Sequence, residues 1–378
     1  MKAGWEVRAL EECLQPFPIA AKIPKKQFLT QGQYPILSQE ADFINGYWDE
    51  VGDLNHLTSP VVLFGDHTQV LKFIDFNFVV GADGVKILAP KSGIDAKFLM
   101  YFIEANPFPS LGYARHYRHV KSLPIPLPPL EEQKRIVAVL DAAFEGLTRA
   151  RTHIETNLQN ARELFESVLE QTVKQNIADY GLTSLAECAS EITDGDHSPP
   201  PKAPKGIPFI TISNIQKETR RIDFSSTFFV SKSYFDSLKD KRKPKNGDIL
   251  YTVTGATLGI PIQIKEDRDF CFQRHIGLIR PTDQMESNWL SYFLMFRFAF
   301  DQATDGASGA AQKTVSLKTL RGMKLPKVPQ SRQKEIATAL EINWEEIGKL
   351  KAHYRTKLAD LDDLRQSLLA RAFAGALT

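Results

Sequence analysis

The stretch that decides the fold is Pro128-Pro129-Leu130-Glu131-Glu132-Gln133-Lys134-Arg135-Ile136, and it returns as Val328-Pro329-Gln330-Ser331-Arg332-Gln333-Lys334-Glu335-Ile336. Each copy opens a long helical pattern, and each follows a block of mixed composition that is large enough to form a globular domain. Proline is tolerated in the first turn of a helix but not in its interior, so each helix is predicted to begin just after its proline. Two globular blocks that alternate with two matched helices predict a pseudo-twofold molecule.

The repeat extends beyond this core. Ile87-Leu88-Ala89-Pro90 corresponds to Leu278-Ile279-Arg280-Pro281, and Phe98–Phe102 corresponds to Trp289–Phe293. Each block is therefore expected to contain a strand, a turn at proline and then an amphipathic helix. Between these anchors the two blocks diverge, which predicts one fold that presents two different recognition surfaces.

Further strands are indicated by short apolar runs that are bounded by Gly, Asp and Pro. They lie at Pro60–Phe64, Asp75–Val80, Gly206–Ile210 and Asp248–Tyr251. The blocks are thus mixed α and β, with no sheet topology implied. The most apolar stretch, Trp289–Phe300, is too short to span a bilayer and is interpreted as one buried helix.

Both long helices carry a heptad pattern, which is typical of coiled-coil packing. The predicted seam comprises Leu140, Leu147, Ile154, Leu164 and Val168 in the first helix and Leu340, Ile347, Tyr354, Leu361, Leu364 and Leu368 in the second. Asn157, Asn343 and Lys357 are expected to interrupt it as polar residues that fix the register.

Two packing schemes are open for these helices: each could pack on its own globular block, or the two could pair with each other. Matched seams of equal length favour pairing, and an antiparallel pair would place the globular blocks at opposite ends of a rod. The predicted fold is accordingly α+β, with two mixed α/β target-recognition domains at opposite ends of an antiparallel two-helix coiled coil. The expected boundaries are 1–128 and 179–328 for the domains, and 129–178 and 329–378 for the helices.

Composition limits the class of protein. The chain has 378 residues, 43% hydrophobic and 24% charged, and a net charge of +2, which neither requires nor excludes nucleic acid. No signal peptide is evident at the N-terminus. The three cysteines are far apart, and Cys13 and Cys188 occupy equivalent places; all three are interpreted as buried residues of a cytoplasmic protein.

Motifs that would indicate catalysis are missing. The sequence contains no phosphate-binding loop, no dinucleotide-binding glycine turn and no zinc-binding HExxH helix. Asn106-Pro107-Phe108-Pro109 lacks the consecutive prolines of an adenine-methyltransferase motif and is interpreted as a turn. Asp194-Gly195-Asp196-His197 is interpreted as a loop rather than a metal site. We therefore expect no catalytic residue, no metal and no cofactor in this chain.

Nucleic-acid contacts have more support, because lysine and arginine contact phosphates while arginine, asparagine and glutamine read base edges. Candidates come from a basic and aromatic stretch before the first proline lead-in, its counterpart in the second block, a basic run, and polar residues at strand ends. They are His67, Arg115, His116, Tyr117, Arg118, Lys121, Lys241, Arg242, Lys243, Thr254, Gln273, Arg274, His275, Gln312 and Lys313. A solvated surface is the alternative for the basic run, and an ordinary hairpin turn for the glycine-rich segments.

These residues together resemble the specificity subunit of type I restriction-modification systems. The likeness is carried by Leu127–Val137, by Gly206–Ile210 with the following Gly247–Leu250, and by the closing residues Leu364–Thr378. It covers essentially the whole chain. The second lead-in, Lys327–Arg332, has lost most of the family's Pro-Leu-Pro-Pro-Leu-Glu-Glu form.

The resemblance implies two target-recognition domains that each read half of a split, asymmetric sequence in double-stranded DNA. The helices would set the gap and dock two methylation subunits, with restriction subunits where the system cleaves; methylation and ATP-dependent cleavage would belong to these partners. No membrane is implied. The alternatives are a coiled-coil scaffold whose globular ends bind proteins, and an enzyme with an active site that its motifs do not reveal.

Overall fold

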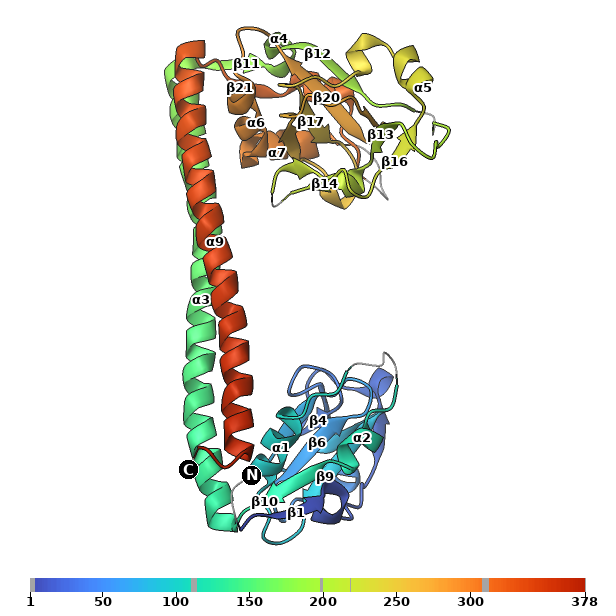
Figure 1. Ribbon diagram of the computed structural model, residues 1–378, viewed down its shortest axis with the longest axis vertical. Helices are drawn as coiled ribbons and strands as arrows, with labels where there is room; N and C mark the ends of the chain where they lie inside the picture. The colour runs from blue at the N-terminus through green and yellow to red at the C-terminus, as the bar shows by residue number, and fades with distance from the viewer. Residues whose placement is uncertain (1–3, 110–113, 198–199, 218, 308–312, 378) are drawn as a thin grey trace. The chain divides into compact units, whose positions relative to one another are not determined.

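The computed structural model describes residues 4–109, 114–197, 200–217, 219–307 and 313–377. The chain forms two compact units: unit 1 comprises Met1–Glu155 and Tyr354–Thr378, and unit 2 comprises Thr156–His353. Each unit thus contains one globular block and a segment of each long helix, as Figure 1 shows. The structure divides the helices between the units, where the sequence suggested separate helical domains.

Unit 1 is built on two four-stranded sheets. The first, antiparallel, has the order β2-β9-β6-β7, and the second has the order β3-β8-β4-β5 with parallel β3–β8 and β8–β4 pairs. A ribbon of β1 (Glu6–Ala9) and β10 (Pro124–Leu127) closes the unit. The strand bounds are β2 Leu14–Gln15, β3 Lys22–Pro24, β4 Tyr34–Leu37, β5 Gly46–Trp48, β6 Val61–Gly65, β7 Leu71–Ile74, β8 Val79–Ala82 and β9 Val85–Pro90.

Unit 2 repeats this plan. Its antiparallel sheet has the order β12-β20-β17-β18, its second sheet the order β16-β13-β19, and β11 and β21 form the closing ribbon. A small hairpin, β14–β15, is added between β13 and β16. The bounds are β11 Leu182–Ser184, β12 Ala189–Asp194, β13 Ile207–Ile210, β14 Ile215–Gln216, β15 Arg221–Ile222, β16 Phe228–Val230, β17 Ile249–Thr252, β18 Pro261–Gln263, β19 Cys271–Phe272, β20 Ile276–Pro281 and β21 Lys324–Pro326.

The strand registers make the two units comparable residue by residue. Leu63 of β6 pairs with Ile87 and with Lys72, whereas Leu250 of β17 pairs with Leu278 and with Ile262. Ile87 and Leu278 were matched by the sequence repeat, so Lys72 and Ile262 occupy equivalent positions. One position in the shared scaffold therefore holds a lysine in unit 1 and an isoleucine in unit 2.

Short helices pack against the sheets (Figure 1). Unit 1 has α1 (Ala96–Glu104) and α2 (Tyr117–Lys121). Unit 2 has α4 (Leu185–Cys188), α5 (Lys232–Ser237), α6 (Ser287–Met295), α7 (Arg297–Asp305) and α8 (Leu317–Gly322). The 3-10 turns are η1 Leu10–Cys13, η2 Lys25–Gln27, η3 Val51–Asp53, η4 Ile212–Asn214, η5 Asp240–Arg242 and η6 Gly255–Thr257.

The prediction of a single helix over Trp289–Phe300 is wrong. Phe296 has an extended backbone that ends α6 and begins α7, and its side chain is buried. The break lets Phe296 and the α7 residues Ala299 and Ala303 enter the same core. An apolar run without glycine or proline gives no sign of such a bend. Cys13, Cys188 and Cys271 are free and buried, as expected.

The long helices are α3 (Leu130–Tyr180) and α9 (Gln330–Phe373), and each begins directly after its proline. In unit 1, Phe144 of α3 lies under the guanidinium of Arg365 at 3.7 Å. In unit 2, the rings of Phe165 and Trp344 are 5.1 Å apart. In unit 1, Arg151 of α3 also forms an ion pair with Asp362 of α9, so residue numbers rise along α3 as they fall along α9 and the two segments are antiparallel. They also join the core of their globular block, so the two packing schemes coexist.

The predicted seam is half correct in its register. Positions such as Leu140, Leu340 and Ile347 are buried, but Leu164 is 56% exposed and Leu364 is 46% exposed. The prediction placed the next seam residue three positions after Leu140, after Leu340 and after each seam position seven residues further on. In the structure the next seam residue lies four positions after them, so a different set of side chains is buried or half-buried. These are Phe144, Arg151, Leu158 and Phe165 in α3 and Trp344, Lys351, Leu358 and Arg365 in α9.

The polar residues expected to interrupt the seam are exposed for the same reason, and these are Asn157, Asn343 and Lys357. Steps of three-then-four and four-then-three have the same mean period, so periodicity cannot separate them. The remaining predicted seam residues, namely Leu147, Ile154, Val168, Tyr354, Leu361 and Leu368, are half-buried.

The repeated glutamine fastens each long helix to its globular block. Gln133 is 1% exposed; its Nε2 donates to the carbonyls of Pro128 (2.9 Å) and Gly93 (3.1 Å), and its Oε1 accepts from the Asp95 amide (2.9 Å). Gln333 makes the same three contacts in unit 2, to the Val328 and Gln284 carbonyls and the Glu286 amide. Asp95 and Glu286 are the residues that cap α1 and α6. The glutamine therefore fixes the angle between the long helix and the neighbouring short helix.

Over the described ranges, none of the helices is both long and apolar enough to cross a bilayer.

Candidate nucleic-acid interface

Three chain segments of unit 1 meet at one edge of the first sheet. They are the β6–β7 loop, the β8–β9 turn and the segment before α2. The Asp66 amide donates to the Gly84 carbonyl (2.6 Å), the His116 amide donates to the Asp66 carbonyl (2.9 Å), and His67 Nδ1 lies 3.1 Å from the Ala114 carbonyl. We call this set of segments, residues 66–70, 83–84 and 114–118, surface 1.

Unit 2 assembles the same three segments. The Val253 amide donates to the His275 carbonyl (3.0 Å), the Val315 amide donates to the Val253 carbonyl (2.9 Å), and the Gly255 amide donates to the Lys313 carbonyl (3.4 Å). Residues 253–259, 273–275 and 313–316 are called surface 2. The hydrogen bonds show that surfaces 1 and 2 occupy the same place on the shared scaffold.

Equivalent positions on the two surfaces carry different side chains. The backbone bonds pair His67 with Thr254 and Gly84 with His275. They likewise pair Ala114 with Lys313 and Arg115 with Thr314. Gly84 has a φ of +74°, and a Cβ there would lie 2.6 Å from Gln39 Oε1 and 2.8 Å from His67 Cδ2. The positive φ strains any other residue at this turn, so unit 1 favours glycine there, with the ends of the Gln39 and His67 side chains beside it.

Surface 1 gathers most of the candidates predicted for the first block. Arg115 and Arg118 are exposed, and Lys121 forms a surface ion pair with Glu11 at 3.5 Å. Tyr117 is half-buried, with its ring 6.4 Å from that of Phe64 and with Lys86 Nζ 5.5 Å from its centroid. Burial raises the pKa of Tyr117, and the nearby Glu11 and Asp66 raise it further. The phenol is therefore a neutral hydroxyl at physiological pH.

His116 is not on the surface. It is 0% exposed, and its Nδ1 lies 3.0 Å from the Asp66 carbonyl. His116 was predicted to contact DNA; in this structure its side chain is buried and holds the segment before α2 to the β6–β7 loop. A pattern of basic and aromatic residues cannot tell which member turns inward.

Surface 2 presents Arg274 and Lys313 as exposed cations, with Gln273 and His275 half-buried beside them. The Arg274 amide donates to the Asp196 carbonyl, and the Asp196 amide donates to the Phe272 carbonyl, both at 3.1 Å. Gly195 permits this approach, since a Cβ there would lie 2.1 Å from the Phe272 oxygen. Thr254 is buried, and its hydroxyl has no hydrogen-bond partner among the residues described. Gln312 lies outside the described residues.

The basic run after α5 is divided between surface and interior. Lys241 is exposed, but Arg242 lies between Asp194 (3.5 Å) and Asp196 (4.0 Å) with its side chain 28% exposed. Lys243 donates to the Asp236 carbonyl (3.2 Å) and lies 5.5 Å from the Phe235 centroid. Arg242 and Lys243 were predicted to contact DNA; in this structure both side chains interact with groups of their own unit, Arg242 with two partly exposed carboxylates and Lys243 with a backbone carbonyl.

The Asp194–His197 segment uses its side chains in the same network. His197 Nε2 lies 2.8 Å from Asp194 Oδ2, and the Tyr234 hydroxyl donates to Asp196. Burial raises the pKa of Tyr234, and the bond to Asp196 raises it further. Within the described ranges, no group of three His, Cys, Asp or Glu side chains is arranged to hold a metal ion.

Sequence reasoning missed two groups that support surface 1. Gln39 accepts from the His67 amide through Oε1 (3.2 Å), and its carbonyl accepts from the Thr68 hydroxyl (2.6 Å). Lys86 covers Tyr117. Gln39 lies between strands with no charged or aromatic neighbour pattern, so nothing in the sequence marked it.

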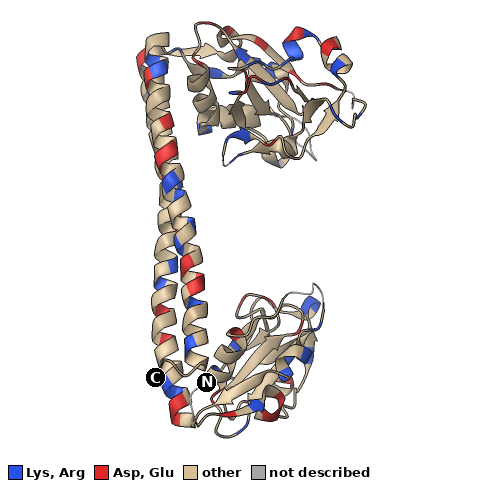
Figure 2. Ribbon diagram, in the orientation of Figure 1, with Lys and Arg blue, Asp and Glu red and all other residues tan. Residues whose placement is uncertain are grey.

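Charge is mixed over both units. Figure 2 shows basic and acidic residues interspersed on the strands and helices of each unit, with no region of one sign only. Phosphate contacts would thus come from individual exposed cations such as Arg115, Arg118, Arg274 and Lys313, in keeping with the small net charge.

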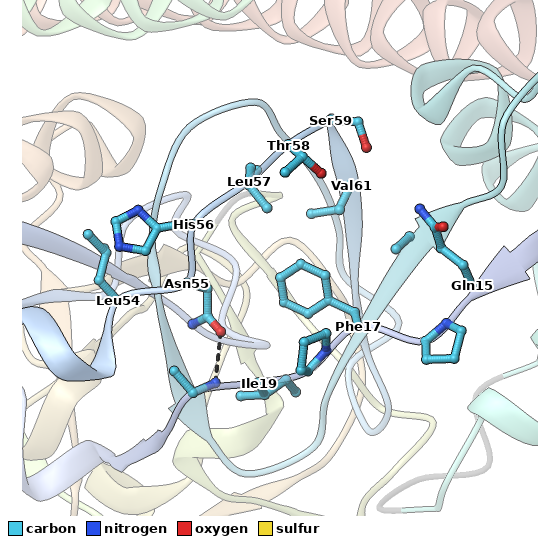
Figure 3. A pocket seen from close by; sticks show the side chains of 14 residues that line it. Gln15, Phe17, Ile19, Leu54, Asn55, His56, Leu57, Thr58, Ser59 and Val61 are labelled. Atoms are coloured by element: carbon cyan, nitrogen blue, oxygen red, sulfur yellow. Dashed lines mark hydrogen bonds between the residues drawn. The ribbon is translucent and has the colours of Figure 1, made fainter.

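A pocket of unit 1 lies apart from these segments, between residues 15–20 and 54–61 (Figure 3). Phe17, Ile19 and Leu57 give it an apolar lining. Two of its polar side chains are hydrogen-bonded: Asn55 Oδ1 accepts from the Ala20 amide (3.0 Å), and His56 Nδ1 lies 3.3 Å from Asn77 Nδ2.

Comparison with known proteins gives one consistent family. Residues 2–160 and 191–350 each match the model for the type I restriction modification DNA specificity domain. The specificity subunit of the type I restriction enzyme EcoKI from Escherichia coli strain K12 is 22% identical over 77% of this chain and 68% of its own length. The EcoBI specificity subunit of Escherichia coli is 25% identical over 67% of this chain and 58% of its own length.

Solved structures share the fold. A structure from work on complex assembly and conformational transition of the type I R-M system has a TM-score of 0.77 at 20% identity, covering 100% of this chain and 99% of that one. The HsdS subunit from Thermoanaerobacter tengcongensis gives 0.53 at 19% identity, covering 100% and 98%. With both halves matched by one domain model, this chain belongs to the type I restriction modification DNA specificity family.

Proposed function

We propose that surface 1 and surface 2 each read one half of a split, asymmetric DNA sequence. The observation that carries this proposal is the matched backbone frame with unlike side chains, namely His67 against Thr254, Gly84 against His275 and Ala114 against Lys313. A shared frame would give each unit the same docking on the duplex. Different side chains on it would then select different bases, because base edges in the major groove differ in donors and acceptors.

The long helices supply the remaining part of the proposal: their length sets the gap between the half-sites, and they dock the methylation subunits. Leu164 and Leu364 support the docking role. They occupy equivalent positions in the matched helices, and each exposes a large apolar side chain. Methylation and ATP-dependent cleavage are then reactions of the partner subunits, and this chain contributes recognition.

Binding of random-sequence and target DNA duplexes by the complex of this chain with its methylation subunit tests the function. We expect affinity to fall steeply as salt rises, because each neutralised phosphate releases counterions. Arg115→Ala and Arg274→Ala should each lower the slope of log affinity against log salt by about 1. The exposed Lys22→Ala, on β3 and outside both surfaces, is the control. Binding that is insensitive to salt and to DNA sequence would favour a protein-binding scaffold instead.

A further inference from the structure

Lys72 is a buried cation that the shared scaffold does not need. It is 3% exposed on β7, in the position that unit 2 fills with the buried Ile262. Burying a charge is costly unless it is paired or hydrogen-bonded, so a lysine in place of an isoleucine calls for a specific reason. Unit 1 differs from unit 2 at this point in the loop that follows the same strand, β4 in unit 1 and β13 in unit 2.

Among the described residues, the hydrogen bonds of the Lys72 ammonium group all go to that loop. Nζ donates to the carbonyls of Asp42 (2.5 Å) and Phe43 (3.1 Å) and to Asn45 Oδ1 (3.0 Å). Three acceptors match the three donors of a lysine. Burial lowers the pKa of Lys72 to about 8, while Asp42 and Glu40 oppose that shift. The loop thus holds a buried ammonium group among its carbonyl and amide oxygens.

Asn45 makes further hydrogen bonds within the loop. Its Oδ1 also accepts from the Ser38 amide (2.7 Å) and hydroxyl (3.0 Å), and its Nδ2 donates to the Asp42 carbonyl (2.8 Å). Both ends of the loop are therefore held to each other and to β7. These hydrogen bonds restrain the loop, and such restraint helps to hold the side chains of a binding site in position.

The side chains at the tip of this loop are apolar. Phe43 is 47% exposed and Ile44 is 40% exposed, next to each other at the tip. Adjacent exposed apolar side chains offer a surface that an apolar group of a ligand can cover. The ring of Phe43 rests near that of Phe76, with centroids 6.1 Å apart, so it is supported from behind.

The loop is continuous with surface 1. Gln39, at its start, bonds to both His67 and Thr68. His67 in turn lies against Ala114, next to the exposed Arg115. The loop thus begins beside surface 1, at Gln39, and its tip lies at Phe43, beside Phe76 just past the far end of β7. A duplex bound to surface 1 would reach the tip by lying along this strand.

We propose that residues 38–45 form a base-reading loop of unit 1, in which Lys72 is the positioning residue and Phe43 and Ile44 contact the methyl group of a thymine. Apolar side chains recognise that methyl in the major groove. The inference rests on the proposed function of surface 1 as a reader of one half-site. It adds the residues that select bases there and the kind of base selected.

The test uses the full chain in complex with its methylation subunit and a pool of random-sequence DNA duplexes, from which bound duplexes are sequenced. Three variants are compared with the wild type: Phe43→Ala, Lys72→Met and the control Val7→Ala, which removes an exposed apolar residue of β1 (45%). Phe43→Ala and Lys72→Met should relax the same base positions, all in one half of the selected sequence, whereas Val7→Ala should change none. A variant that is merely less stable would instead weaken the base preference at all positions of the selected sequence.

Thymine is then replaced by uracil, one position at a time, in the selected duplex. The wild type should lose about fourfold in affinity at one thymine of that half, as expected for one buried methyl group, and Phe43→Ala should lose nothing further there. Unchanged base preferences in Phe43→Ala would overturn the reading loop, and insensitivity to every uracil would overturn the thymine contact. If the wild type itself selects no two-part sequence, the proposed function fails, and that outcome is distinct from both. Because Phe43 is exposed, its variant decides the matter even if Lys72→Met does not fold.

Discussion

At the scale of single residues, one equivalent position of the shared scaffold holds a lysine in unit 1 and an isoleucine in unit 2. Lys72 and Ile262 have the same strand partners, yet one is a cation bonded to a loop and the other is part of an apolar core. Sequence patterns could not reveal this, because Leu71-Lys72-Phe73-Ile74 looks like an ordinary strand whose lysine faces solvent. The same limit applied to His116, which a basic and aromatic pattern placed on the surface and the structure places in the interior.

The buried ammonium group of Lys72 predicts a dependence of stability on pH. Its pKa is about 8 in the folded chain and near 10.4 in an unfolded one. Between these values the unfolded state binds more protons, so stability should rise with pH over this interval. Asp42 and Glu40 are the charged groups that act on it. Comparing urea unfolding of the wild type and Lys72→Met from pH 7 to 10 isolates the effect from other titrating groups. A difference that stays constant over this range would contradict the prediction.

Gln133 offers a second test at this scale. Gln133→Met keeps the length of the side chain but leaves two carbonyls and one amide without their partner. We expect a loss of about 2 kcal/mol in the free energy of unfolding, since buried groups left unpaired cost more than the bond contributes. Lys134→Met, at the exposed neighbouring position, is the matched control and should have little effect in the same urea titration. Equal stabilities for the two variants would show that the glutamine does not fasten the helix.

At the scale of elements, the long helices were the most predictable part of the chain. Proline lead-ins placed their starts correctly, and one set of seam positions is buried, as at Leu140 and Ile347, or half-buried, as at Leu147. The second set was displaced by one residue, because Leu164 stands beside Phe165 and either could continue an apolar stripe. Burial of an aromatic residue decided the choice, and this depends on the partner helix rather than on the pattern.

The observed register predicts that substitutions at buried and at exposed apolar residues of the long helices have different effects on stability. Ile347→Ala should lower the free energy of unfolding by about 3 kcal/mol, as is typical of a buried side chain cut to alanine. Leu164→Ala and Leu364→Ala should change it by less than about 0.5 kcal/mol, because both are exposed. Under the proposed docking role, the two leucine variants should instead weaken assembly with the methylation subunit, measured by analytical ultracentrifugation. Strong destabilisation by Leu164→Ala would restore the first register.

At the scale of the whole molecule, duplication with divergence is the feature that the sequence predicted best. The repeat identified equivalent strands, helices and even the matched places of Cys13 and Cys188. It could not predict the strand order, because no sequence signal says which strands pair. The repeat also did not predict which segments form each candidate interface. Three segments that are distant in the sequence of each block come together in the fold through backbone hydrogen bonds such as that from Val253 to His275.

The proposed spacer role predicts a change in the gap between half-sites. Inserting the same seven residues in α3 and α9 keeps the heptad register and lengthens both helices by about 10 Å, roughly three base pairs. We expect the gap to widen while the bases in each half stay the same. Sequencing of duplexes bound by the complex of the lengthened chain with its methylation subunit measures both quantities. An unchanged gap would exclude the helices as the spacer.

The central claim is that each unit reads its own half of the DNA site. Its most direct measurement is a genome-wide map of methylated adenines in cells that express this chain with its methylation subunit, and in cells where residues 181–327 are exchanged for the corresponding domain of a relative. The claim predicts that one half of the methylated sequence changes while the other half is retained. Changes in both halves, or in neither, would contradict it.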